Sequence, residues 1–224
     1  MTLKKQSILI LIFSLSLTTI YAKNEVLEKQ IVYSMKHGVF EVKKLLKKVS
    51  IYKIFEEDKT LLHYAVEEGN YKIVQFLVNQ NIYLSQKGGD FYGTALQEAI
   101  FYHHIEIAIF LIEQGTLVNE QNINGDTALH LAANNGDLVL IETLISHGAS
   151  KYILNNNGKT PLDLIPDLTW DDNREMKRIL SSKEKTNFKS KIKNVNTYKD
   201  KTKIINQINP NSTIINSTVG IKIN

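Results

Sequence analysis

A segment that recurs about every 33 residues constrains the fold of this chain more than any other feature. Each copy opens with a threonine, and the spacings between Thr60, Thr94, Thr127 and Thr160 are 34, 33 and 33 residues. Self-similarity at a fixed period of this length is typical of proteins built from stacked structural repeats. Each repeat in such a protein packs mainly on its neighbours. The sequence therefore predicts a repeat architecture.

The copy that opens at Thr127 reads Thr-Ala-Leu-His-Leu-Ala, and Gly136 and the pair Gly148-Ala149 follow it at later positions. This segment resembles the ankyrin repeat, whose opening motif is Thr-Pro-Leu-His-x-Ala. The resemblance implies an all-α ankyrin-repeat solenoid of helix-turn-helix units with projecting loops, over roughly residues 26–180.

The other copies depart from the family pattern at a few positions. Asn81 stands where the family usually has glycine, Gln97 replaces the histidine of the motif, and His103 replaces the first loop glycine. We expect seven segments in all. They are a signal peptide over 1–22, an N-terminal capping repeat over 23–57, full repeats over 58–91, 92–124 and 125–157, a C-terminal capping repeat over 158–182, and a basic tail over 183–224.

Each full repeat should contain two antiparallel helices. The first helices are expected over 60–68, 94–102 and 127–134, and the threonine at each start can accept a hydrogen bond from a backbone N–H that has no partner within the helix. The second helices carry apolar residues at helical spacing. These are Ile73, Val74, Leu77 and Val78; Ile107, Ala108, Leu111 and Ile112; and Leu140, Ile141, Leu144 and Ile145. Gly115 and Gly148 should end two of these helices, with Asn81 in the same role in the first full repeat.

Lysines replace apolar residues in the N-terminal capping repeat. Lys43 and Lys47 stand where the next repeat has Val74 and Val78. A terminal repeat has no neighbour on its outer side and needs a polar face there. The cluster formed with Lys44 and Lys48 therefore has two interpretations, a solvated cap, which we favour, and a binding patch.

Residues 1–22 have the layout of a secretory signal peptide. Lys4 and Lys5 precede an apolar stretch over 7–20, and Ala22 offers a small residue for cleavage. A transmembrane helix needs about 20 apolar residues, so this stretch is short for one. An uncleaved anchor and a buried helix are the alternatives. We expect export, to the periplasm or to the medium.

The charge of the chain is unevenly distributed. The net charge is +4, yet residues 183–224 hold nine lysines against two acidic residues, and residues 23–182 hold 16 basic against 21 acidic side chains. Nucleic-acid binding by the acidic body is therefore disfavoured. The tail is expected to be disordered. Three alternatives stay open for it: a strand pair, weak contact with an anionic membrane or envelope polymer, and folding back on the body.

No residue pattern indicates catalysis or a cofactor. The chain has no cysteine, no glycine-rich phosphate loop and no Gly-x-Ser-x-Gly motif. His103-His104 lack a third ligand at a useful spacing, so a metal site is not expected there. His63 and His130 occupy the motif position where, by the resemblance, the imidazole bonds the preceding threonine. We expect no enzyme and no cofactor.

Ankyrin-like stacks bind partners through their inner helices and projecting loops, so the phase from each threonine predicts contact positions. Aromatic residues are enriched in binding hot spots, and acidic residues accompany them here. The hypothesis is an acidic, aromatic groove between the first two full repeats; the alternative for Phe101 is packing beneath the loop at Phe91-Tyr92. The predicted partner-binding residues are Tyr64, Glu67, Glu68, Phe91, Tyr92, Glu98, Phe101, Tyr102, Leu131, Asn134 and Asn135.

These expectations define an exported, monomeric module that binds another protein. Resemblance to exported bacterial ankyrin proteins suggests two uses, protection of a periplasmic enzyme and neutralisation of a toxic effector. Two alternatives remain, a secreted effector that engages host proteins and an envelope-associated structural protein anchored by its basic tail. Fold alone does not choose among them.

Overall fold

The computed structural model of the 224-residue chain describes residues 26–166 and 171–182. The predicted signal peptide and the predicted basic tail lie outside these residues. Contacts divide the chain into two compact units, residues 1–82 and residues 83–224, called here the first and second units. Among the described residues, no helix combines the length and the apolar character that crossing a bilayer requires.

The first unit consists of short helices around one apolar core. A helix over 26–37 is followed by α2 (Val39–Leu45), a 3-10 turn η1 (Glu56–Asp58), α3 (Leu61–Glu67) and α4 (Tyr71–Val78). α4 packs against both α2 and α3. Side chains that are fully excluded from solvent come from each α-helix described in this unit: Ile31, Met35, Val42, Leu61, Leu62, Ile73 and Leu77.

The second unit repeats a helix pair and adds a hairpin at one loop. β1 (Lys87–Gly88) pairs antiparallel with β2 (Gly93–Thr94), and α5 (Ala95–Phe101), α6 (Ile105–Glu113), α7 (Ala128–Asn135) and α8 (Leu138–Ser146) follow. The 3-10 turn η2 (Pro161–Leu164) and α9 (Asp171–Ser181) close the described part.

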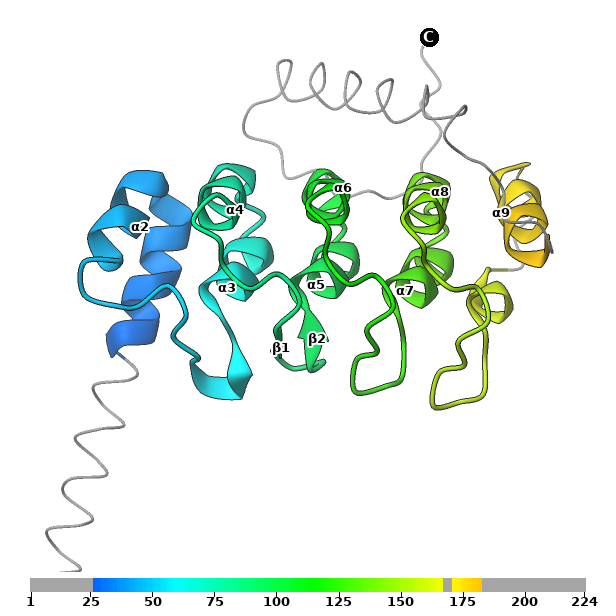
Figure 1. Cartoon of the computed structure of the whole chain (residues 1–224), viewed down its shortest axis with the longest axis horizontal. Helices are drawn as coiled ribbons and strands as arrows, with labels where there is room; N and C mark the ends of the chain where they lie inside the picture. The colour runs from blue at the N-terminus through cyan, green and yellow to red at the C-terminus, as the bar shows by residue number, and fades with distance from the viewer. Residues whose placement is uncertain (1–25, 167–170, 183–224) are drawn as a thin grey trace, which may run out of the picture. The chain divides into compact units, whose positions relative to one another are not determined.

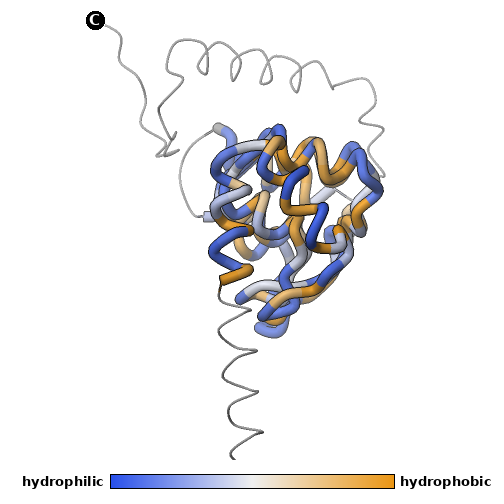
Figure 2. The backbone as a smooth tube through the Cα atoms, turned by 90° about the vertical axis from the view of Figure 1, so that its left-hand side faces the viewer, coloured by the Kyte–Doolittle hydropathy of each residue, from blue (hydrophilic) through white to orange (hydrophobic). Residues whose placement is uncertain are grey.

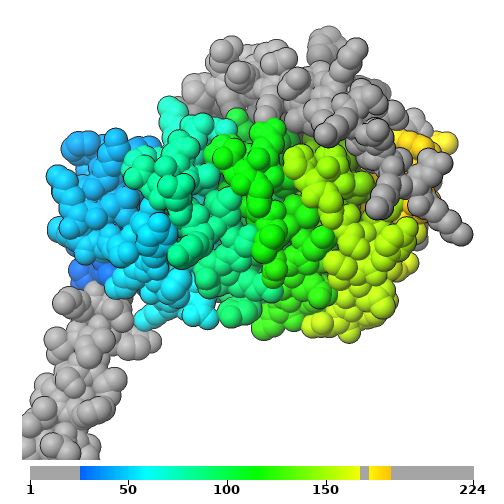
Figure 3. Space-filling view, viewed as in Figure 1, coloured from blue at the N-terminus to red at the C-terminus, as the bar shows by residue number. Residues whose placement is uncertain are grey.

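Neighbouring helices of the second unit lie in two rows. α5, α7 and η2 pack side by side as an inner row, and α6, α8 and α9 pack as an outer row, with each inner element against its outer partner (Figure 1). Where grey atoms do not cover them, the coloured residues of 83–166 form a continuous surface without open gaps in Figure 3. Apolar and polar residues alternate along the helices of the tube in Figure 2, because one side of each helix is buried against its neighbours. The predicted all-α solenoid is confirmed within this unit.

The four threonines occupy equivalent places, as the spacing predicts. Each is the residue before its helix or 3-10 turn, with extended backbone angles and a capping-box partner three residues later. In the first unit, the Thr60 N–H donates to His63 Nδ1 at 3.1 Å and Thr60 Oγ1 accepts from the His63 N–H at 3.4 Å. The helices begin one residue after each threonine, so the predicted starts are one residue early, and α7 runs one residue beyond its predicted end at 134.

Two residues other than glycine stand in for glycine at the helix ends. Asn81 has φ 60° at the turn where later repeats have Gly115 and Gly148, and His103 has φ 59° at the turn where its neighbours have Gly69 and Gly136; all four glycines also have positive φ. A left-handed backbone is accessible to asparagine at a modest cost and less readily to histidine. The predicted role of Asn81 at the end of α4 is confirmed.

The lysine cluster of the predicted N-terminal capping repeat lies at the surface. Lys43, Lys44, Lys47 and Lys48 are exposed, and Lys43 Nζ lies 5.5 Å from the centre of the Phe76 ring. At the other end α9 buries Met176, Ile179 and Leu180. The exposed lysines agree with a solvated cap, and their role as a binding patch stays an alternative.

Candidate functional site

A groove in the second unit lies between the inner helices α5 and α7 and extends to two projecting loops. It encloses about 360 Å³. Six of the predicted partner-binding residues line it together with Gly93, Gln97, His103, Asn122 and Asn124. Those six are Phe91, Glu98, Phe101, Leu131, Asn134 and Asn135.

An aromatic cluster forms one side of the groove. The Phe91 and Phe101 rings lie 4.3 Å apart between centres, and Tyr102 meets Phe101 edge-on at 5.2 Å. Phe101 nevertheless keeps 44% of its surface exposed, and Tyr102 keeps 36%. The predicted packing of Phe101 beneath the loop is therefore present, and it leaves one flank of the ring facing the groove. Tyr92 and Tyr102 are exposed, but neither lines the groove.

The other side of the groove carries amide groups from α7. Asn134 and Asn135 are exposed, and Leu131 beside them is half-buried. Asn135 Nδ2 donates to the Ile100 carbonyl at 3.0 Å, which ties the end of α7 to the last turn of α5. The carboxamide of Asn134 makes no hydrogen bond among those found in the described residues and faces water.

Two buried amide side chains hold the loops that rim the groove. Gln97 Nε2 donates to the carbonyls of Glu120 and Asp126 at 2.9 and 2.8 Å, and Gln97 Oε1 accepts from the Thr94 N–H at 2.8 Å. Asn122 Oδ1 accepts from the N–H groups of Asn124 and Asp126, each at 2.9 Å. The rim is therefore fixed by hydrogen bonds that leave few donors unpaired.

The lack of a side chain at Gly93 leaves room for the Gln97 carboxamide beside it. A Cβ at this position would lie 3.0 Å from Gln97 Oε1 and 3.4 Å from Gln97 Cβ. A larger side chain would therefore press on the carboxamide that bridges Thr94 to the next loop.

Gly93, Gln97 and His103 are absent from the predicted site residues. Their departures from the family motif at 97 and 103 were a signal that could have drawn attention to them.

Two predicted surface positions are wrong, because Tyr64 and Glu98 are buried, with 7% and 4% of their surface exposed. Both are the fourth residue after their threonine, as Leu131 is in the next repeat. Tyr64 is covered from the preceding side, by Phe55 and by Glu28 of the helix over 26–37. The position of a residue on its own helix does not show whether a neighbouring element buries its side chain.

Tyr64 has a structural role in the first unit. Its hydroxyl donates to Glu28 Oε1 at 3.3 Å, and its ring meets Phe55 edge-on at 5.8 Å. Burial raises the pKa of the Tyr64 hydroxyl far above its ordinary value, and the adjacent Glu28 carboxylate raises it further. Removal of Tyr64 is therefore expected to lower stability.

Glu67 is exposed and Glu68 is half-buried, and both form ion pairs within the first unit. Lys59 Nζ lies 3.6 Å from Glu67 Oε2, and Lys36 Nζ lies 3.4 Å from Glu68 Oε1. One partner of each pair is exposed, and solvent screens such pairs, so they contribute little net stability. The predicted groove between repeats 58–91 and 92–124 combines residues of both units and stays a prediction.

The α5–α7 groove combines apolar surface with amide groups and one acidic residue. Glu98 is its one acidic lining residue, and no lysine or arginine of the described chain lines it. Groups of three or more residues able to hold a metal ion are also absent from the described residues. The groove offers apolar, aromatic and amide surface for non-covalent binding.

Two rows of short helices with loops projecting from the inner row define a stacked helical-hairpin repeat protein. A family model described as "Ankyrin repeats (3 copies)" matches residues 30–122 and 96–165, which together exceed half of the 224 residues. The chain belongs to the ankyrin repeat family. Its repeats form a protein–protein interaction module, and the family is typically non-enzymatic.

Similar proteins come from distant organisms. A fowlpox virus protein named for its ankyrin repeats is 30% identical over 105 residues, which cover 46% of this chain and 31% of the viral protein. A Treponema pallidum protein, also named for ankyrin repeats, is 34% identical over 93 residues, 42% of this chain and 31% of that protein. Human palmitoyltransferase ZDHHC13 is 33% identical over 140 residues, 60% of this chain and 22% of the enzyme. The chain thus spans less than a third of the length of these relatives.

Proposed function

We propose that this chain is an exported module that binds a segment of a partner protein in the α5–α7 groove. The observation that carries the proposal is the meeting, in one groove, of an exposed Phe101 flank with the free carboxamide of Asn134. Binding hot spots combine a large apolar anchor with polar groups that fix its orientation.

The dimensions and chemistry of the groove suit a short peptide segment. About 360 Å³ lies within the range of about 300–1,000 Å³ typical of binding pockets, so a few side chains would fill it. Carboxamides both donate and accept hydrogen bonds, and Asn134 is therefore matched to the N–H and C=O groups of an extended backbone. Phe101 would then contact an apolar side chain of that segment.

The proposal of export rests on residues 1–22, with Lys4 and Lys5 before the apolar stretch. In the periplasm such a module would bind and protect an enzyme or neutralise a toxic effector. In the medium it would act as an effector on host proteins. The chain is proposed to bind without catalysing a reaction, without a cofactor and as a monomer.

The basic tail supports a second candidate function. Residues 183–224 carry a net charge of +7, from nine lysines and two acidic residues. Basic segments bind anionic lipid surfaces at about 1 kcal/mol per lysine near the surface. An envelope-associated structural protein is therefore the alternative, with the repeats held close to the membrane by the tail.

A capture experiment tests the groove. Purified mature protein, immobilised and exposed to periplasmic extract, is expected to retain a stoichiometric soluble partner. Phe101→Ala combined with Asn134→Ala should weaken that capture about 30-fold, as loss of a hot spot of about 2 kcal/mol implies. Tyr152→Ala is the matched control, because Tyr152 is an aromatic residue 68% exposed away from the groove.

The outcomes separate the candidates. Equal capture by both variants would exclude the α5–α7 groove as the binding site. Recovery of the protein in the membrane fraction, lost on deletion of 183–224, would favour the envelope-associated alternative. A protein that stays in the cytoplasm with residues 1–22 intact would contradict export.

A further inference from the structure

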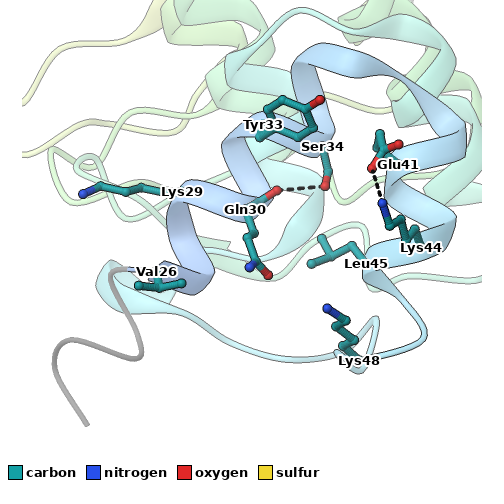
Figure 4. A pocket seen from close by; sticks show the side chains of 9 residues that line it. All are labelled: Val26, Lys29, Gln30, Tyr33, Ser34, Glu41, Lys44, Leu45 and Lys48. Atoms are coloured by element: carbon teal, nitrogen blue, oxygen red, sulfur yellow. Dashed lines mark hydrogen bonds and ion pairs between the residues drawn. The ribbon is translucent and has the colours of Figure 1, made fainter. Parts of the chain in front are cut away.

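A second groove lies in the first unit, between the helix over 26–37 and α2. It encloses about 430 Å³, and its lining comes from these two helices and the turn that follows α2 (Figure 4). It shares no residue with the α5–α7 groove and is independent of the function proposed above.

The base of this groove is apolar and internally satisfied. Leu45 and Ser34 are each 5% exposed, and the Ser34 hydroxyl donates to the Gln30 carbonyl at 2.8 Å. Val26 and Tyr33 line the groove and keep 57% and 52% of their surfaces exposed. Water therefore covers apolar surface in this groove, and a bound apolar side chain would displace that water.

The edges of the groove are basic. Lys29, Lys44 and Lys48 line it against one acidic residue, Glu41, which lies 3.6 Å from Lys44 Nζ. Figure 4 shows Leu45 between the two helices with Lys48 below it, and Lys44 beside Glu41. The α5–α7 groove has one acidic and no lysine or arginine lining residue, so the two grooves select for partners of different charge.

We propose that this groove binds an acidic amphipathic helix of a partner protein. Two adjacent helices form a trough into which the side-chain ridge of a third helix packs. Apolar residues of that helix at positions i, i+3 or i+4, and i+7 would cover Leu45, Val26 and Tyr33. Its acidic residues would lie within reach of Lys44 and Lys48, and this charge complementarity sets the partner's chemistry.

Two other occupants are disfavoured by charge and shape. The tail over 183–224 holds nine lysines against two acidic residues and would be repelled by the lysines at the groove. An anionic lipid surface would match the charge. However, a trough between two helices receives a ridge better than it receives the plane of a bilayer.

The test uses the full chain and a designed probe. The probe is a fluorescein-labelled 16-residue helical peptide with leucines on one face and glutamates on the others, and its binding is measured by fluorescence anisotropy. Lys44→Glu combined with Lys48→Glu should weaken binding at least about tenfold, through loss of two attractive contacts and gain of two repulsive ones. Binding should also weaken as salt rises.

The matched control is Lys43→Glu combined with Lys47→Glu. It makes the same charge change on the same segment, at residues that do not line the groove. We expect less than about threefold loss from it, because these two side chains do not line the groove and act on the probe only across solvent, where salt weakens the interaction. Circular dichroism checks that both variants keep the fold.

Three results would overturn the proposal. The first is equal loss in the two variants, which would indicate a non-specific charge effect. The second is a probe that shifts amide resonances of α5 and α7 but not those of Tyr33 and Leu45. The third is binding to vesicles of phosphatidylglycerol with no binding of the peptide.

Discussion

In the second unit, each repeat begins with a threonine that caps a helix or a 3-10 turn. The residue three positions later differs between the repeats that precede another described repeat and the last described repeat. Between repeats, Gln97 and His130 each join their own threonine to the following loop. In the last repeat, Asp163 Oδ2 accepts from the Thr160 N–H at 2.8 Å and from the Thr160 hydroxyl at 2.7 Å. Among the described residues Asp163 bonds no residue other than Thr160.

The requirement for a donor explains this difference. His130 Nδ1 accepts from the Thr127 N–H at 3.1 Å, so the proton of the neutral ring is assigned to Nε2, which donates to the Lys159 carbonyl at 3.1 Å. Gln97 also combines one acceptor with a donor group. A carboxylate only accepts, so aspartate is compatible with this position only where no following loop has to be held.

Packing should give the largest contrast between the two settings. Leu144 of α8 is fully buried between α6 and α9, whereas Leu162 of η2 is half-buried. Leu144→Ala is expected to lower the free energy of unfolding by about 2–5 kcal/mol, since it leaves a cavity. Leu162→Ala should cost less. Urea unfolding measures both, and an unchanged midpoint for Leu144→Ala would contradict the stacked core.

Replacement of the bridging Gln97 side chain with a carboxylate, as Asp163 has in the last repeat, should have the next largest effect on stability. Gln97→Glu keeps the shape but replaces the donor to the Glu120 and Asp126 carbonyls with an acceptor. We expect a loss of about 1–3 kcal/mol, the cost of leaving buried polar groups unpaired.

The control for Gln97→Glu is Asp163→Asn. Its carboxamide oxygen can still accept from Thr160, and the side chain is exposed, so we expect a small change in the same unfolding experiment. Equal destabilisation by the two variants would mean that the bridge to the next loop contributes nothing.

The last described helix, α9, is bonded at its end by one lysine. Lys151 Nζ donates to the carbonyls of Ile179 and Ser182, at 3.1 and 2.6 Å, and so binds the C-terminal end of α9. Lys151→Met keeps the apolar stem and removes the donors, at an expected cost of about 1–2 kcal/mol. Hydrogen exchange should become faster at the amides of α9 and stay unchanged in α5. Faster exchange throughout the second unit would instead indicate general destabilisation.

The smallest expected effect is a pH dependence specific to the last repeat. Hydrogen bonds from Thr160 hold the pKa of the Asp163 carboxyl below its ordinary value of 3.8. The stabilisation from these bonds is therefore present above the ordinary value and is lost as the pH falls through the lowered pKa. Asp163→Asn should remove this part of the acid dependence, as measured by unfolding between pH 2 and pH 6. If the variant kept the acid dependence of the parent protein, that dependence would come from other carboxyl groups.

Much of the fold could be predicted from residue types at fixed distances from each threonine. Local chemistry determines these features: a threonine before a helix satisfies free N–H groups, and the residue three positions later completes the capping box. The candidate groove could be predicted only in part. Phe101, Asn134 and Asn135 lie where the phase places them, whereas the burial of Tyr64 and Glu98 depends on neighbouring elements.

The sequence by itself determined the number of residues per repeat, the capping of each inner helix and the apolar side of each outer helix. The repeat length is the spacing of the four threonines, and the other two follow from interactions between residues three or four apart along the chain. Only the tertiary structure decided which inner-helix positions face water and which lie between repeats. The direction of a side chain about its own helix axis is a local property. Its exposure is set by the neighbouring helix, whose distance and side-chain sizes are not encoded within the repeat itself.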